Sequence, residues 1–181
     1  ILKNLYLENG YKKRKKNDFK GALVEYDKAI KLKTNDPLPF IQKGKIHFLQ
    51  KDYDLAVLNF TRGISKNREG SVIASETYLQ RGISNFYLNN YNSAIKDLTE
   101  ALILSKVYGK PKSKNEFQNE ILFYRSISNM EENNYQEGLD DINIAIENEF
   151  RLNRSYRIRA EIRYYLKDYE GAIEDASKSI I

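Results

Sequence analysis

Side chains that commonly perform catalysis are scarce in this sequence. It has no cysteine and one histidine, His47, so it offers no thiol nucleophile, no zinc–thiolate site and no histidine pair for a metal or a proton relay. It also has no glycine-rich phosphate loop. The acidic pairs Asp140-Asp141 and Glu131-Glu132 are adjacent in sequence, so we expect each pair to spread over a solvated helix surface. We therefore predict no enzyme, no metal and no cofactor.

The densest charge cluster is the run Lys12–Lys16, which consists of five cations. One hypothesis makes it a nuclear-import signal, an acidic-lipid contact or a phosphate-binding patch. The alternative places it in the last turn of a helix, where cations complement the helix dipole. We favour the alternative, because no similar run recurs later in the chain. The segment Lys110–Lys114 is expected in a loop, where it serves solubility or forms a contact.

The net charge of +5 is unevenly distributed. Residues 1–50 hold 12 Lys and Arg against 5 Asp and Glu, residues 51–115 hold 10 against 6, and residues 116–181 hold 8 against 14. A protein dedicated to nucleic acid should be basic along its length, so the acidic last third disfavours such a partner. No apolar run approaches the roughly 18 residues of a membrane span, and we predict no membrane partner.

Five short blocks share one pattern and reveal an internal repeat. Each block has a turn-forming Asp or Asn, an aromatic residue, two spacers, a small residue and an aliphatic residue. The small residues stand at positions 22, 56, 94, 138 and 172, so the spacings are 34, 38, 44 and 34 residues. Apolar residues at helical spacing flank every block, which predicts a helix, a turn and a second helix in each repeat.

Further small residues recur twelve positions before and seven positions after those of the blocks. Such positions let two antiparallel helices approach closely, and the aromatic or large residues between them fill the remaining space. The upstream set is Gly10, Gly44, Gly82, Ser126 and Ala160, and the downstream set is Ala29, Gly63, Ala101, Ala145 and Ser179.

On these positions the chain resembles tetratricopeptide repeat (TPR) proteins, whose unit is a 34-residue helix-turn-helix. The resemblance implies an all-α, right-handed α-solenoid of five repeats, at about 3–36, 37–70, 75–108, 119–152 and 153–181. There are departures, which we expect to weaken individual repeats. The leucine that the family places before the first small residue is replaced by Asn9, Lys43, Arg81, Arg125 and Arg159.

The junctions between repeats differ in length. Between repeats 1 and 2, Asp36 is expected to cap the next helix, with Pro37 at its first position. Extra residues fall near Asn67–Ser71 and Val107–Asn115, where we expect surface loops that are either tolerated insertions or functional. The chain begins without methionine and ends on an apolar helix, so we expect residues 1–181 to be one solenoid within a longer protein.

The resemblance also implies that the first helix of each repeat lines a concave groove. An apolar groove could accept an amphipathic helix or an extended peptide, and the alternative is that its side chains only pack between helices. The groove residues carried over by position are Leu7, Tyr11, Arg14, Ile41, Lys45, Phe48, Leu79, Ile83, Phe86, Phe123, Ile127, Met130, Arg157 and Tyr164.

Some TPR cochaperones grip the C-terminal carboxylate of heat-shock chaperones with lysine, asparagine and arginine side chains. The corresponding residues here are Leu7, Tyr11, Gln42, Glu76 and Gln80. None matches, and Glu76 places an anion where that clamp needs a cation. The equivalent positions fail when the comparison starts at repeat 2 or repeat 3. We therefore predict that such a carboxylate is not the ligand.

The resemblance thus implies a non-catalytic protein–protein interaction scaffold. Its partner would be a peptide or amphipathic helix bound in the groove, within a multi-subunit complex. We expect a cytoplasmic protein, with a nuclear or cytoskeletal assembly as other intracellular settings. The alternative is a nuclear or nucleic-acid-associated adaptor that uses Lys12–Lys16.

Overall fold

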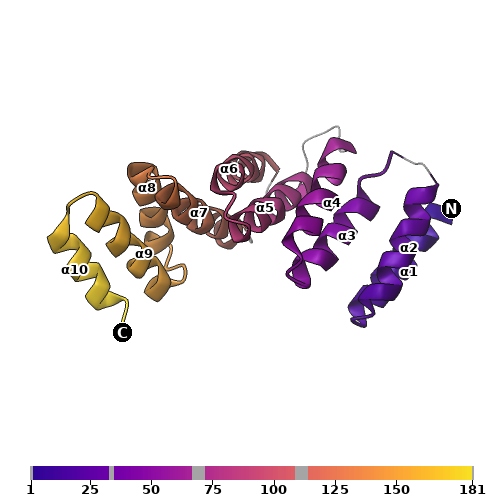
Figure 1. Cartoon of the computed structure of the whole chain (residues 1–181), viewed down its shortest axis with the longest axis horizontal. Coiled ribbons are helices and arrows are strands. Elements are labelled where there is room, and N and C mark those ends of the chain that lie inside the picture. Colours follow the sequence, from indigo (N-terminus) through magenta and orange to yellow (C-terminus); the bar gives the residue numbers. More distant parts are fainter. Residues whose placement is uncertain (1, 33–34, 67–71, 109–113, 181) are drawn as a thin grey trace.

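The computed structural model describes residues 2–32, 35–66, 72–108 and 114–180, which form a row of antiparallel helix pairs (Figure 1). Each sequence block lies at the turn within a pair and at the start of its second helix. The helices are α1 (Leu2–Lys15), α2 (Phe19–Lys31), α3 (Leu38–Leu49), α4 (Tyr53–Lys66), α5 (Val72–Tyr87), α6 (Tyr91–Tyr108), α7 (Lys114–Glu131), α8 (Tyr135–Glu147), α9 (Leu152–Tyr165) and α10 (Tyr169–Lys178). The insertion predicted at 67–71 and the centre of that at 107–115 lie outside the described residues.

The helices form two layers of different spacing. Each odd-numbered helix contacts the next odd-numbered helix, from α1 through α9, whereas no such contact joins two even-numbered helices within the described ranges. Helices are closest on the inside of a curved stack, so the odd-numbered helices form the inner layer and the even-numbered helices the outer one. Figure 1 shows the pairs in sequence order along the long axis, with the two termini at opposite ends.

Small residues allow the two helices of each pair to pack closely, as the sequence predicts. Tyr26 of α2 and Phe60 of α4 are fully buried. Their rings lie against Gly10 and Gly44 of the inner helices, and a Cβ added to Gly44 would stand 2.6 Å from the Phe60 ring. A larger residue at either glycine would therefore push the pair apart.

The turn within each pair contains one residue in the left-handed conformation. This conformation ends the inner helix and redirects the chain into the outer helix, and asparagine tolerates it better than other non-glycine residues. The carboxylates of Asp18 and Asp168 then accept hydrogen bonds from the backbone N–H groups of Gly21 and Gly171, at 2.8 and 3.0 Å, and so cap α2 and α10. The left-handed residues are Asn17, Lys51, Asn89, Asn133 and Lys167, with φ between 59° and 65°.

The junction between the first two pairs differs by one residue from the sequence expectation, because Pro37 and not Asp36 is the cap residue of α3. An Asp36 carboxylate oxygen accepts a hydrogen bond from the Leu38 N–H at 2.9 Å. Pro37 precedes the first residue of α3, where its missing N–H costs no helical hydrogen bond. A second oxygen of Asp36 pairs with Lys3 of α1 at 2.6 Å, which ties the inner helices of the two pairs together.

Arginine residues of three inner helices form ion pairs that repeat along the chain. Each arginine donates two hydrogen bonds to a buried aspartate sixteen residues later, on the outer helix of the same pair. A planar guanidinium and a planar carboxylate can form two parallel hydrogen bonds, and this geometry makes the hydrogen bonds strong and fixes the relative orientation of the two groups. The forks are Arg81–Asp97 (2.8 and 2.6 Å), Arg125–Asp141 (both 2.7 Å) and Arg159–Asp175 (2.7 and 2.8 Å).

The third guanidinium nitrogen connects each fork to the preceding pair. It donates to a side-chain oxygen on the preceding outer helix at 2.9 to 3.1 Å. The partners are Thr61 for Arg81, Thr99 for Arg125 and Asn143 for Arg159. We call this repeated arrangement the arginine ladder. Each of these arginines has its charge paired and joins three helices, while the expectation that the departures weaken their repeats stays a prediction.

Lys43 occupies the ladder position in α3 with a different partner. Asn59 stands where α6, α8 and α10 carry aspartate, and its amide donates a hydrogen bond to the Leu55 carbonyl at 2.8 Å. Lys43 donates to Asp27 of the preceding outer helix at 2.6 Å. Asp27 occupies the position that holds Thr61 in the next repeat. The acidic partner of Lys43 therefore lies on the preceding helix pair and not on its own pair, and it neutralises the lysine charge.

Candidate functional site

Much of the predicted groove is packed between helices. Ile41, Leu79, Ile83, Phe123 and Met130 are buried, and all except Ile41 belong to the main hydrophobic core. Their burial follows from the close spacing of the inner helices, which brings these side chains against the neighbouring pair. The apolar strip is therefore less open than the sequence suggests, and these residues support the inner surface from beneath.

The other predicted groove residues are more accessible. Tyr11, Arg157 and Tyr164 are exposed near the two ends of the row. The half-buried set consists of Leu7, Arg14, Lys45, Phe48, Phe86 and Ile127. The most exposed of the predicted groove residues thus lie on the first and last inner helices.

A cavity of about 260 Å³ lies in the middle of the inner layer, between α3, α5 and α7. We call it the central cavity. Three of its residues belong to the predicted groove, and four do not. Glu76 and Gln80 occupy positions of the carboxylate clamp in repeats 1 to 3, and Glu120 occupies such a position when the comparison starts at repeat 2. No sequence pattern marks Phe117. The lining residues are Phe48, Glu76, Leu79, Gln80, Ile83, Phe117 and Glu120.

The polar groups of the central cavity are two carboxylates and one amide. Glu76 accepts a hydrogen bond from Lys45 at 3.2 Å, and Glu120 accepts one from Arg151 at 3.4 Å. Burial raises the pKa of Glu120, and the nearby Arg151 only partly opposes this shift. The amide oxygen of Gln80 is shielded from solvent and accepts no hydrogen bond within the described residues. The cavity therefore holds more hydrogen-bond acceptors than its own donors satisfy.

An aromatic cluster stiffens the edge of the cavity. Tyr53 of α4 stacks on Tyr87 of α5 with ring centres 4.7 Å apart, and Phe48 meets Tyr53 edge-on at 5.9 Å. Phe86 meets Tyr124 of α7 edge-on at 5.2 Å, and the Tyr87 and Tyr124 hydroxyl oxygens are 3.3 Å apart. The cluster connects three pairs, so it fixes the position of Phe48 in the cavity wall.

The basic run ends the first inner helix, as the favoured hypothesis states. Helix α1 ends at Lys15. Lys12 pairs with Glu8 at 2.7 Å, and Lys13 pairs with the buried Glu25 at 3.1 Å. The ammonium group of Lys15 lies 5.1 Å above the Tyr11 ring. Much of this positive charge is therefore engaged within the chain.

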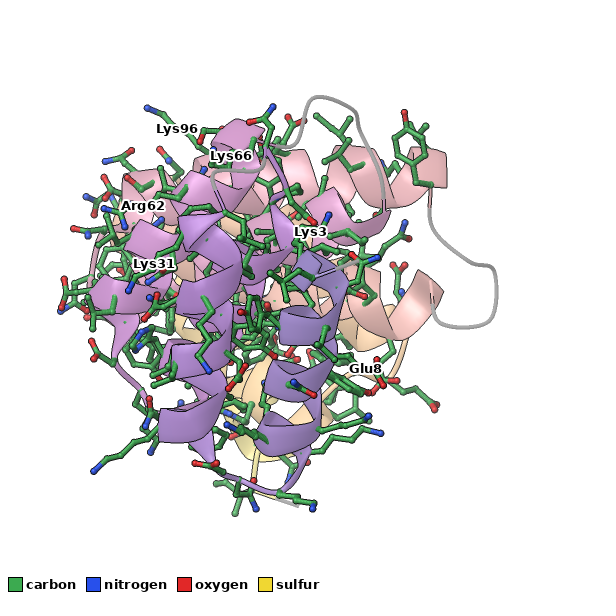
Figure 2. All side chains as sticks on the ribbon, turned by 90° about the vertical axis from the view of Figure 1, so that its right-hand side faces the viewer. Lys3, Glu8, Lys31, Arg62, Lys66 and Lys96 are labelled. Atoms are coloured by element: carbon green, nitrogen blue, oxygen red, sulfur yellow. The ribbon has the colours of Figure 1, made fainter. Side chains whose placement is uncertain are left out.

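A second group of cations lies on the outer helices. Figure 2 shows Lys31, Arg62, Lys66 and Lys96 on one side of the molecule, away from Glu8. They come from α2, α4 and α6, and Lys66 lies 5.6 Å above the Phe40 ring. These residues are dispersed over three helices, and the described residues around them form no cavity that all four line.

Across the described ranges, no group of three or more acidic or histidine side chains is placed to hold a metal ion. No helix in the same ranges is both long enough and apolar enough to cross a membrane.

Known proteins share both the sequence pattern and the shape. No protein-family model matches the chain. Human tetratricopeptide repeat protein 4 is 34% identical over 59 residues, which are 33% of this chain and 15% of that protein. In the crystal structure of MamA, 90% of the MamA chain superimposes on 99% of this chain, with a TM-score of 0.82 and 19% sequence identity. In the crystal structure of YrrB, a TPR protein with an unusual peptide-binding site, 83% of the YrrB chain superimposes on 97% of this chain. Its TM-score is 0.84 and its sequence identity is 19%.

The chain folds as a TPR solenoid. The solenoid spans less than a quarter of the curated relatives that it matches by sequence, so their activities belong to much longer proteins. The structural likeness extends over almost the whole TPR solenoid and agrees with the right-handed α-solenoid that the sequence resemblance implies.

Proposed function

We propose that this TPR solenoid is a non-catalytic scaffold for protein–protein interaction, and that its inner surface binds a peptide or helix of a partner. The observation that carries this proposal is the central cavity, which opens between three successive inner helices and has two glutamates in its wall that each make a single cationic contact. Such a site can accept an anchoring side chain while the rest of a peptide follows the helices. The peptide-binding site of YrrB, a protein of the same fold, supports the proposal.

The inner surface has the features of a partly desolvated interface. Its middle combines the apolar residues Leu79 and Ile83 with the charged wall of the central cavity. Its ends carry the exposed residues Tyr11, Arg157 and Tyr164. Aromatic and arginine side chains are enriched at protein interfaces. A cytoplasmic location and membership of a multi-subunit complex remain part of the proposal.

A photo-crosslinking experiment tests which layer meets the partner. Benzoylphenylalanine replaces Phe48 or Phe117 in the wall of the central cavity, because these aromatic side chains tolerate an aromatic analogue. A charged substitution at Ile83 would not serve, since this residue is 4% exposed and a buried charge would unfold the repeat. The matched control carries benzoylphenylalanine at Ile103, an exposed residue of the outer helix α6.

We expect the same protein to be captured from native extract through Phe48 and Phe117 but not through Ile103. A peptide from the crosslinked region of that protein should then compete with capture. Equal capture through Ile103, or no capture through either inner position, would contradict the proposal. Circular dichroism of each variant establishes that the helices are retained.

The alternative of a nucleic-acid adaptor has weaker support, because Lys12 and Lys13 already pair with acidic residues. It predicts binding of RNA or DNA whose affinity falls steeply between 50 and 200 mM salt, as counterion release requires. A filter-binding titration with the Lys15→Ala, Lys16→Ala variant as comparison tests it. Absence of binding near physiological salt would remove this alternative.

A further inference from the structure

We propose that the central cavity accepts the arginine side chain of a partner peptide. This inference rests on the proposed function and adds the chemistry of the bound residue to it. The volume of the cavity is the first argument. At about 260 Å³ it is smaller than the roughly 300–1,000 Å³ of pockets for small molecules and cofactors. A single long side chain therefore fits it better than a free ligand of cofactor size.

The polar side chains of the wall select a hydrogen-bond donor. Glu76 and Gln80 come from α5 and Glu120 from α7, and no cation is among the lining residues. An ionised carboxylate accepts hydrogen bonds only, and each of these two carboxylates has a single cationic partner. An anionic residue would meet two like charges, so the wall excludes Asp, Glu and a phosphorylated side chain.

The apolar part of the wall favours arginine over lysine. Phe48 and Phe117 offer aromatic surfaces, and Leu79 and Ile83 form the buried floor. A guanidinium is planar, stacks on aromatic rings and is less strongly hydrated than an ammonium. Its five N–H groups also reach several acceptors at once, whereas a lysine ammonium offers three. The methylene stem of either side chain would contact the apolar floor.

The cations already near the two glutamates do not satisfy them. Lys45 and Arg151 each make one contact, at 3.2 and 3.4 Å, with a carboxylate on the margin of the cavity. The Glu76 side chain is still 48% exposed, and an ion pair of this kind contributes little. The raised pKa of Glu120 indicates that burial outweighs the stabilisation from Arg151. An entering guanidinium would replace these contacts with more hydrogen bonds.

Peptide pools test the inference directly. Four fluorescein-labelled pools of nine-residue peptides carry Arg, Lys, Leu or Glu at the centre and an equal mixture of Ala, Leu, Ser, Asn and Tyr elsewhere. Fluorescence anisotropy measures their affinity for the folded chain. We expect the Arg pool to bind about tenfold more tightly than the Leu pool, the effect of one charge-assisted hydrogen bond. The Lys pool should fall between them.

Three variants identify the residues responsible. The double variant Glu76→Gln, Glu120→Gln should bind the Arg pool and the Leu pool with equal affinity. The control Glu137→Gln removes an exposed carboxylate of α8, outside the cavity, and should keep the preference. Lys45→Met removes a competing cation and should tighten binding of the Arg pool. Circular dichroism verifies the helical content of every variant.

The possible results separate this inference from the proposed function. If all pools bind equally, the groove binds peptides but the inference is wrong. If the Glu pool binds most tightly and Lys45→Met weakens it, the cavity recognises anions and the inference is again wrong. If no pool binds, both the inference and the proposed function fail.

Discussion

The arginine ladder predicts a large loss of stability when one aspartate is removed. In the Asp141→Asn variant, the Arg125 guanidinium loses a two-bond fork with both distances at 2.7 Å. The Arg125 side chain is 19% exposed and that of Asp141 is 7% exposed, so water can replace the lost carboxylate only in part. Removing one partner of a buried ion pair costs about 3–5 kcal/mol. Because Arg125 keeps some access to water, we expect about 3 kcal/mol.

This loss can be measured by thermal and urea unfolding at pH 7, followed by circular dichroism at 222 nm. For a chain of this length, 1 kcal/mol corresponds to about 2–4 °C, so the Tm should fall by about 6–12 °C. The matched control is Asp27→Asn, which breaks the 2.6 Å pair with Lys43. The Lys43 side chain is 19% exposed, like that of Arg125, but the Asp27 side chain is 49% exposed, so this pair is more open to water than the fork and we expect a cost of about 1 kcal/mol.

A double variant separates the strength of the pair from the penalty for an unpaired charge. Burial raises the pKa of Asp141, and the fork with Arg125 opposes this shift. In a buried ion pair the desolvation of both charges offsets much of their attraction, so we expect the intact pair to add little net stability. The Arg125→Met, Asp141→Leu variant leaves no unpaired charge and should recover most of the stability. Equal losses for Asp141→Asn and Asp27→Asn would refute this reasoning. So would a double variant that costs the sum of its two single substitutions.

Three further predictions concern single residues. Lys51→Gly should raise the free energy of unfolding by about 1 kcal/mol in urea titrations, because Lys51 has a φ of 61°, and Asn89→Gly should gain less. Gly44→Ala should lower the Tm at a cost of about 1–3 kcal/mol by crowding Phe60, and unchanged melting would contradict the close approach. Burial lowers the pKa of His47, so stability should fall as the pH drops below the ordinary histidine pKa of 6.5, where the unfolded chain binds the proton more readily. His47→Gln should remove that part of the pH dependence of the Tm.

The sequence and the structure agree most closely where a signal recurs within one repeat. Gly44 and Phe60 are sixteen residues apart, and the same small and large pairing recurs in other repeats, so the pattern predicts that the helices meet. The arginine ladder was missed although it also has a spacing of sixteen residues. A comparison with the family at a single position sets Arg125 against a leucine, whereas the role of Arg125 depends on Asp141, sixteen residues later in the chain. Searching the repeats for pairs of opposite charge would have found the forks.

The central cavity is harder to predict for a physical reason. Phe48, Glu76 and Phe117 come from three different repeats, and their distances depend on how tightly successive pairs stack. That spacing is a property of the assembled core and is encoded in no single repeat. The burial of Leu79 and Ile83 has the same origin. Position in the repeat thus predicts the helix face that a residue occupies, but not how much of its side chain stays open.

The position of the central cavity across three inner helices couples its width to the curvature of the solenoid. A stack in which each pair contacts mainly its neighbours can bend like a spring, and α3, α5 and α7 separate or converge as it does so. A ligand held between these helices would therefore set the bend at the middle of the molecule. Conversely, a force that straightens the solenoid would widen the cavity and release the ligand. The same three helices would then form the binding site and also make the affinity for the ligand depend on the force applied to the solenoid.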